Sequence, residues 1–140
     1  MKQASRILTL QTRGPGMYDF TRDIRVFTRE TEAVEGVLTL KCRHTSASLT
    51  IQENADPDVQ TDLLDAMDRI SPHDPSLYIH GAEGPDDMPA HIRTVLLGVT
   101  LSIPLMDGRL TLGTWQGVYL WEHRDAPHQR QFAAHLLYEY

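Results

Sequence analysis

The chain has 140 residues, with 19 Asp plus Glu against 13 Lys plus Arg, which gives a net charge of −6 when the seven histidines are neutral. That length favours one domain, and a hydrophobic fraction of 41% is typical of a globular protein. The acidic balance excludes a general nucleic-acid binder, because such binding depends on Lys and Arg neutralising phosphates. A small phosphorylated ligand held by a few residues remains compatible with this charge.

Cysteine usage and hydropathy indicate a protein of the cytoplasm with no membrane association. The single cysteine, Cys42, has no partner for an internal disulfide, and residues 1–14 lack the apolar core of a signal peptide. No apolar run approaches the roughly 20 residues that a membrane-spanning helix requires.

The first third of the chain predicts three strands. Residues 5–12 alternate with apolar side chains on both faces, and residues 24–28 alternate again after a turn at Gly14, Pro15 and Gly16. Residues 37–44 place Leu38, Leu40, Cys42 and His44 on one face.

Two helices follow. Residues 56–70 carry an apolar stripe with helical spacing, and Asp56 and Pro57 are suited to its first turn. A second helix begins at residue 87 or 88 and ends at Gly98, after a short extended segment at residues 77–80.

Strands dominate the remainder, at residues 99–105, 110–114, 117–122 and 130–138, with a hairpin turn at Asp107 and Gly108. No internal repeat or linker interrupts the chain. We therefore expect a single α+β domain with two helices packed on or beside an antiparallel or mixed sheet.

Two candidate site residues end the strand at 37–44. His44 continues the apolar face and is followed by the hydroxyls of Thr45 and Ser46, which are able to hold a phosphate or orient the imidazole ring. The alternative is a core histidine whose ring is satisfied by a backbone carbonyl. Cys42 shares this face, and a buried hydrophobic role is favoured over a reactive thiol.

The loop before the second helix is rich in metal-ligand residue types. His80, Asp86, Asp87 and His91 lie within twelve residues, and His91 falls in the first turn of the helix, where an anion is favoured. The two acids suit either capping of the helix or a Mg²⁺ ion that bridges a pyrophosphate.

The strand at 117–122 is predicted to be covered on both faces. Gln116 and Glu122 lie on an otherwise apolar face, so they belong to the rim of a pocket or to a hydrogen-bonded network. The opposite face carries Trp115, Tyr119 and Trp121, which we expect to form an oligomer contact. The other histidines are expected on the surface: His73, His123, His128 and His135.

Three long segments resemble one known family. HTSASLTIQENADPDV at 44–59, EGPDDMPAHIRTVLLG at 83–98 and SIPLMDGRLTLGTWQGVYLWEHR at 102–124 resemble the YjbQ family, an uncharacterised protein family also described as secondary thiamine-phosphate synthase. The resemblance implies a compact domain with a barrel-like, mostly antiparallel sheet that assembles as a homotrimer. It also implies weak joining of a pyrimidine diphosphate to a thiazole phosphate, with loss of pyrophosphate.

Carried over position by position, the resemblance assigns roles to individual residues. The expected catalytic residues are His44, His91, Gln116 and Glu122. The expected phosphate or substrate ligands are Thr45, Ser46, Asn54, Thr114 and Arg130. The expected ligands of a Mg²⁺ or Zn²⁺ ion are His44, His80, Asp86, Asp87 and His91.

Two other functions compete with the synthase. Convergence of His44, His80 and His91 on Zn²⁺ would make a metal-assisted hydrolase. The chain would alternatively be a noncatalytic trimeric module that binds a phosphorylated metabolite in a polar cleft.

Overall fold

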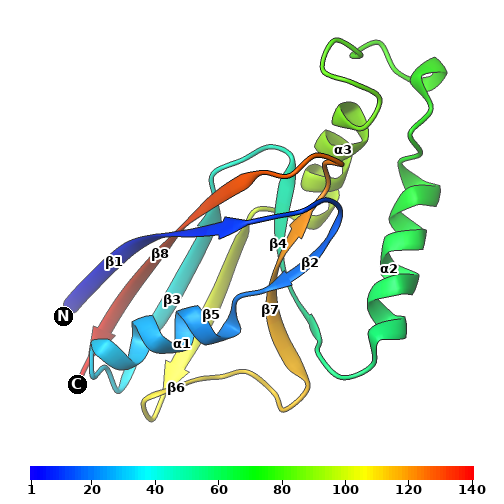
Figure 1. The fold of residues 1–140 in the computed structure, drawn as a ribbon. Helices are drawn as coiled ribbons and strands as arrows, with labels where there is room; N and C mark the ends of the chain where they lie inside the picture. The colour runs from blue at the N-terminus through cyan, green and yellow to red at the C-terminus, as the bar shows by residue number, and fades with distance from the viewer.

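Two antiparallel sheets curl into a half-barrel in the computed structural model, which describes residues 1–140 (Figure 1). The first sheet has the spatial order β1 (Lys2–Gln11), β8 (Gln129–Glu139), β3 (Glu35–Cys42), β5 (Thr100–Met106) and β6 (Arg109–Leu110). The second has the order β2 (Gly16–Asp19), β7 (Gln116–Glu122) and β4 (Ala47–Glu53). This arrangement confirms the predicted single α+β domain.

Three α-helices complete the fold, where the sequence predicted two. They are α1 (Thr21–Glu30), α2 (Pro57–Ile70) and α3 (Asp87–Leu97), with a short 3₁₀ helix, η1 (Pro75–Leu77), between the last two. Figure 1 places α1 at the end of the half-barrel that holds both termini, and α2 and α3 beside the second sheet. No helix is long and apolar enough to cross a membrane.

The core lies inside the half-barrel, and β3 shows how the sequence builds it. Leu38 and Leu40 are buried while Thr39 is exposed, as the period of a strand requires. Leu38 lies opposite Ile103 of β5 and Leu136 of β8, so one apolar layer crosses three strands. The predicted inward face of this strand is confirmed.

The segment at residues 24–28 is helical, so the predicted strand is wrong. Ile24, Phe27 and Thr28 are buried, and their spacing of three and four residues is that of one helix face. Five residues are too few to separate this period from alternation, which Ile24, Val26 and Thr28 also satisfy. The ring of Phe20, the residue before α1, packs 4.3 Å from that of Phe132 and joins the helix to the core.

Both predicted helices are confirmed, together with their end signals. The side chain of Asp56 accepts a hydrogen bond from the Asp58 amide, and Pro57 begins α2. Gly98 ends α3 with φ 89°, a left-handed value that a side chain would strain.

Three strand assignments change. β4 was not predicted, because polar residues such as Ser48 and Gln52 interrupt its apolar positions. The strand expected at 110–114 is reduced to Arg109–Leu110, and the extended segment expected at 77–80 is replaced by η1 and irregular backbone.

Two of the three aromatic residues expected at an oligomer contact are buried within the chain. Tyr119 and Trp121 are only 4% and 2% exposed, while Trp115 is 64% exposed. The Tyr119 hydroxyl donates to the carbonyl oxygen of Glu53. Strand β7 is thus covered on both faces, as predicted, and the interface role for Tyr119 and Trp121 was a wrong prediction.

A buried ion pair joins the two sheets at the end of β7. The Glu122 carboxylate accepts hydrogen bonds from Arg130 Nε at 2.8 Å, from Arg130 Nη2 and from Thr12 Oγ1 at 2.6 Å. Arg130 Nη2 also donates to the carbonyl oxygen of Ser46. We call Thr12, Ser46, Glu122 and Arg130 the Glu122 network; it connects the end of β1, the start of β4, the end of β7 and the start of β8.

Glu122→Gln is expected to lower the free energy of unfolding by about 3 to 5 kcal/mol, because it leaves the buried Arg130 charge uncompensated. Urea denaturation at neutral pH measures the loss. Glu30→Gln is the control, since Glu30 pairs with Arg6 on the surface and its loss is worth less than about 1 kcal/mol. Equal losses in the two variants would contradict a structural role for the network.

Candidate metal centre and adjoining hollows

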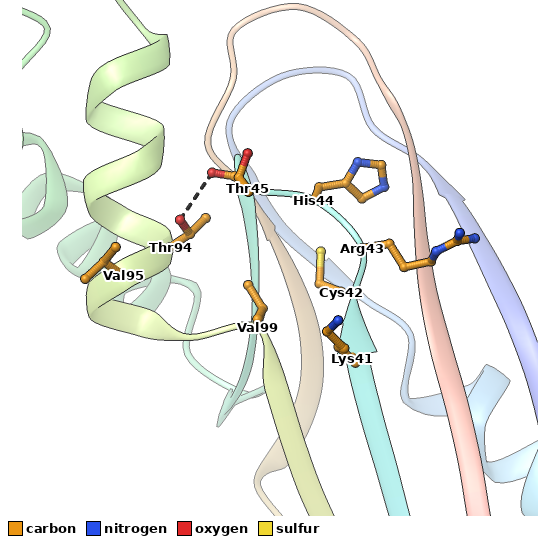
Figure 2. Close-up of a pocket in the computed structure, with 8 residues that line it drawn as sticks. All are labelled: Lys41, Cys42, Arg43, His44, Thr45, Thr94, Val95 and Val99. Carbon is orange, nitrogen blue, oxygen red and sulfur yellow. Dashed lines mark hydrogen bonds between the residues drawn. The ribbon is translucent and has the colours of Figure 1, made fainter. Parts of the chain in front are cut away.

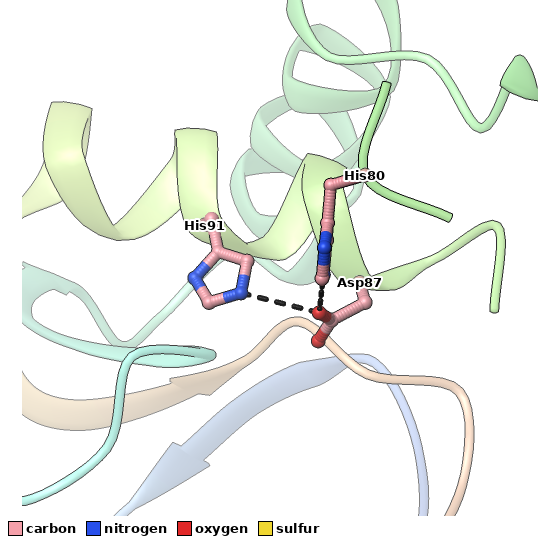
Figure 3. A group of neighbouring side chains, drawn as sticks. All are labelled: His80, Asp87 and His91. Atoms are coloured by element: carbon pink, nitrogen blue, oxygen red, sulfur yellow. Dashed lines mark hydrogen bonds and ion pairs between the residues drawn. The ribbon is translucent and has the colours of Figure 1, made fainter. Parts of the chain in front are cut away.

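Three of the predicted metal ligands meet at the start of α3. Asp87 is the first residue of the helix, His91 follows one turn later, and His80 comes from the preceding loop. Asp87 Oδ2 lies 2.6 Å from His80 Nε2 and 3.1 Å from His91 Nε2 (Figure 3). We call these three residues the histidine cluster.

Arg124 orients the acidic side of this cluster. Its Nη1 donates to Asp87 Oδ1 at 2.8 Å, and its Nε donates to Asp86 Oδ2 at 2.9 Å. The Asp125 amide also donates to Asp86 Oδ2, and Arg124 Nη2 donates to the Glu83 carbonyl oxygen. Arg124 therefore fixes the loop and both carboxylates in one arrangement, a role that the sequence analysis missed.

The charges around the loop shift its acids in one direction. Burial would raise the pKa of Asp87, but the His80 hydrogen bond and the Arg124 charge outweigh burial and hold this pKa below its ordinary value. For Asp86, burial is likewise outweighed by Arg124 and the Asp125 amide, so its pKa is also lowered. Both acids are carboxylates at neutral pH.

Arg93 anchors α3 from its other side. This arginine is 2% exposed, and its Nε donates to Ser71 Oγ at 2.7 Å. Its Nη2 donates to Asp68 Oδ1 of α2 and to the Ser71 carbonyl oxygen. The helix that carries Asp87 and His91 is therefore bonded to α2 and to the residue that follows it. The sequence around Arg93 gives no sign of these contacts.

The histidine cluster has the donor set of a transition-metal site. One ligand atom from each of His80, Asp87 and His91 lies within 4.8 Å of the others, so a single ion is able to replace the present hydrogen bonds. Two imidazoles and one carboxylate suit Zn²⁺, whereas Mg²⁺ prefers oxygen donors alone. The arrangement fits Zn²⁺ better than Mg²⁺.

Asp86 lies outside the cluster although it was a predicted ligand. It precedes α3 at the N-cap position, yet its side chain caps no helix amide, since its Oδ2 is held by Arg124 and Asp125. Its contribution is to position Arg124 rather than to face the two histidines.

His44 also lies outside the cluster and has a different partner. Its Nε2 accepts a hydrogen bond from the Gln131 amide at 2.9 Å, which leaves the proton of a neutral ring on Nδ1. Burial and the Arg130 charge lower the pKa of His44 and favour this neutral form. The ring is therefore bonded to the backbone, but to an amide rather than to the expected carbonyl, and His44 is only partly buried.

A hollow of about 550 Å³ separates the end of β3 from α3 (Figure 2). Its lining comprises Lys41, Cys42, Arg43, His44, Thr45, Thr94, Val95 and Val99. The Thr94 hydroxyl lies within hydrogen-bond distance of the carbonyl oxygens of Thr45 and His91. We call this cavity the His44 hollow. Its lining residue Thr94 lies about one helical turn after His91, so the hollow is close to the histidine cluster along α3.

Cys42 is buried and hydrogen-bonds through Sγ to the Ala47 carbonyl oxygen at 3.6 Å. Burial raises the pKa of this thiol, so it stays protonated and is a poor nucleophile. This environment agrees with the prediction that Cys42 is a buried hydrophobic residue rather than a reactive thiol.

The remaining predicted residues lie in two other places. Glu122, Arg130 and Ser46 belong to the Glu122 network, where burial would raise the pKa of Glu122 but Arg130 and Thr12 lower it. Gln116 Oε1 accepts from the Gly113 amide, and Gln116 lines a separate hollow with Asn54 and Thr114. Neither group contacts the histidine cluster.

His123 is fully buried, so its predicted surface position is wrong. Its Nε2 lies 2.8 Å from Ser48 Oγ, and burial together with the Arg93 charge lowers its pKa to about 3. Of the other three, His73 is exposed, while His128 and His135 are partly buried. Alternation along β7 was the available signal, because His123 continues the buried face that contains Trp121.

Comparison with known proteins identifies the family. The model of the UPF0047 protein YjbQ-like family matches residues 6–139. The UPF0047 protein sll1880 of Synechocystis sp. is 48% identical over 96% of this chain and 92% of its own length. The chain belongs to the YjbQ family. YjbQ of Salmonella typhimurium is 45% identical over 85% of this chain and 86% of its own length.

Solved structures of YjbQ-like proteins share the fold. A crystal structure of a YjbQ/UPF0047 family protein from Clostridium acetobutylicum superposes with a TM-score of 0.86 at 34% identity, covering 94% of this chain and 99% of that one. A conserved hypothetical protein from Thermus thermophilus gives a TM-score of 0.83, also at 34% identity and with the same coverage of both chains. Both structures confirm the curled antiparallel architecture.

Arg124→Gln is expected to lower the free energy of unfolding by about 2 to 3 kcal/mol at pH 7, because two buried carboxylates lose their cation. The lowered pKa values of Asp86 and Asp87 stabilise the folded state above pH about 4, and this stabilisation disappears as pH falls through their folded-state pKa values. The deficit should therefore shrink when urea denaturation is repeated at acidic pH. A deficit of the same size at both pH values would contradict the assigned role.

Proposed function

We propose that this YjbQ-family protein is a metal-dependent hydrolase of small phosphorylated molecules, with Zn²⁺ or a similar ion held by His80, Asp87 and His91. The observation that carries the proposal is the convergence of these three donors within 4.8 Å. Three protein donors are typical of catalytic zinc sites, which keep a further position open for water or substrate, whereas structural sites use four.

Accessibility supports a catalytic use. The side chains of His80 and His91 are 40% and 36% exposed, while that of Asp87 is 2% exposed. The imidazoles are thus open to solvent on one side, and the carboxylate is held from behind by Arg124. An ion at this position would supply a water activated for attack and would polarise the substrate.

The His44 hollow supports a phosphorylated substrate. Lys41 and Arg43 line it and form no ion pair with any carboxylate of the chain, although Arg43 donates to Gln131 Oε1. The hydroxyls of Thr45 and Thr94 add neutral hydrogen-bonding groups. Two cations without carboxylate partners in this lining favour a substrate that carries phosphate.

The synthase activity that the family resemblance implies is the second candidate. The same ion and the same cations would neutralise a departing pyrophosphate, which is the main electrostatic demand of that reaction. The donor set favours Zn²⁺ over the Mg²⁺ that commonly accompanies pyrophosphate, and this argues for hydrolysis first. The homotrimer, the noncatalytic binding module and the cytoplasmic location remain predictions from the sequence.

His80→Ala and His91→Ala are each expected to weaken Zn²⁺ binding more than about 100-fold. Loss of a residue that only orients a metal ligand already lowers metal affinity by about 10- to 100-fold, and loss of a ligand should lower it further. Competition with a chromophoric chelator measures the affinity. His73→Ala is the control, because His73 is exposed and stands outside the cluster. Comparable Zn²⁺ affinity in the wild type and in His91→Ala would refute the metal site.

Activity is best tested on protein stripped with a chelator and reloaded with Zn²⁺ or Mg²⁺. We expect Zn²⁺ to restore hydrolysis of a chromogenic phosphate ester or of inorganic pyrophosphate, and His91→Ala to abolish it. A parallel assay supplies the pyrimidine diphosphate with the thiazole phosphate. Faster coupling than hydrolysis would overturn the hydrolase in favour of the synthase, and binding without any turnover would favour a noncatalytic module.

A further inference from the structure

The exposed face of α1 carries three arginines beside an open hollow, at the end of the half-barrel away from α3 (Figure 1). Arg22, Arg25 and Arg29 recur at intervals of three and four residues, which places them along one side of the helix. They line a hollow of about 720 Å³ together with Asn54, Thr114 and other residues. No residue of this hollow belongs to the histidine cluster or to the His44 hollow.

A second hollow of about 430 Å³ continues the first. Arg25 and Arg29 line both, and the second adds Arg109 from β6. Four arginines from two segments of the chain thus line a surface made of two hollows that share Arg25 and Arg29. We call this surface the arginine hollow.

These four cations have no partner within the chain. The arginines that pair with carboxylates are elsewhere: Arg6, Arg93, Arg124 and Arg130. Two acids also line the arginine hollow, Asp19 and Asp23. Four arginines against two acids leave the positive charge of the lining in excess. The Asp19 carboxylate is held by the amide and hydroxyl of Thr21 rather than by an arginine.

The start of α1 borders the first hollow through Phe20, Thr21 and Arg22. Two of its amides are already bonded: the Thr21 amide donates to the Asp19 carboxylate, and the Asp23 amide donates to the Phe20 carbonyl oxygen. The arginines, and not the helix start, therefore supply the positive charge. Asn54 and Thr114 contribute neutral donors from the far wall.

We propose that the arginine hollow binds a small molecule with two or more phosphoryl groups. Arg22 and Arg29 are seven residues apart, about 10 Å along a helix axis, which one phosphate is too small to span. Guanidinium groups bind phosphate with paired hydrogen bonds, so successive arginines suit successive phosphoryl groups. The net charge of −6 and the limited size of the hollow favour a small ligand over a nucleic acid.

The site is separate from the proposed metal centre, so it is tested with the chelator EDTA present. Calorimetric titration at low ionic strength uses orthophosphate, pyrophosphate and tripolyphosphate as probes. We expect tripolyphosphate to bind most tightly, since it reaches the most arginines, and its affinity to fall as salt is added.

Arg25→Gln combined with Arg29→Gln is expected to weaken tripolyphosphate binding by about 100-fold, because each arginine contributes charge-assisted hydrogen bonds. Both residues are exposed, so the variant should keep its fold, which circular dichroism checks. Arg69→Gln, an exposed arginine in the last turn of α2, is the matched control. His91→Ala should bind tripolyphosphate as the wild type does.

Three outcomes would overturn the proposal. One is the absence of saturable binding by the wild type. Another is weakening by Arg69→Gln equal to that by Arg25→Gln alone, since each removes one charge and equality would mean that only net charge matters. The third is binding of a single-stranded oligonucleotide without binding of tripolyphosphate, which would identify a nucleic-acid surface instead.

Discussion

The hydrogen bonds of the Glu122 carboxylate hold together the strand ends at which β1, β4, β7 and β8 meet. This carboxylate accepts hydrogen bonds from two side chains, Arg130 and Thr12, and from the amides of His123 and Arg124. A buried ion pair often costs more in desolvation than it returns in attraction, unless its geometry is good and its remaining lone pairs are satisfied. Glu122 meets both conditions. Its removal would free the starts of β4 and β8 and the ends of β1 and β7 together.

This contact also determines the geometry of the histidine cluster. The amide of Arg124 donates to Glu122 Oε2, and the guanidinium of the same residue holds Asp86 and Asp87. Burial would lower the pKa of Arg124, but the hydrogen bond and charge of Asp86 raise this pKa above its ordinary value. The cluster is thus positioned from the sheet as well as from α3. A pre-positioned carboxylate loses less conformational freedom when an ion binds, which is why supporting residues affect metal affinity.

Periodicity predicted the strands that form the wall of the core, and end signals predicted α2 and α3. Periodicity failed at residues 24–28, because five residues satisfy both the helical and the strand period. It also failed at β4, where the polar Ser48 is buried through its hydrogen bond to His123. The sequence also pointed to the loop at which His80, Asp87 and His91 converge. It could not exclude His44, or find Arg124, because their partners lie 87 and 37 or 38 residues away in the chain. Such pairings depend on the tertiary fold.

Charge is distributed unevenly along the chain in a way that the net value conceals. Residues 53–87 contain ten acids and a single base, Arg69, and this stretch leads into the histidine cluster. The rest of the chain is therefore mildly basic, and four of its unpaired arginines gather around α1. Opposite charges within about 10 Å would largely compensate each other, whereas those at opposite ends of a domain are screened by salt. The proposed cation site at α3 and the proposed phosphate site at α1 share no residue, so the ligand of one site need not neutralise the charges that hold the ligand of the other.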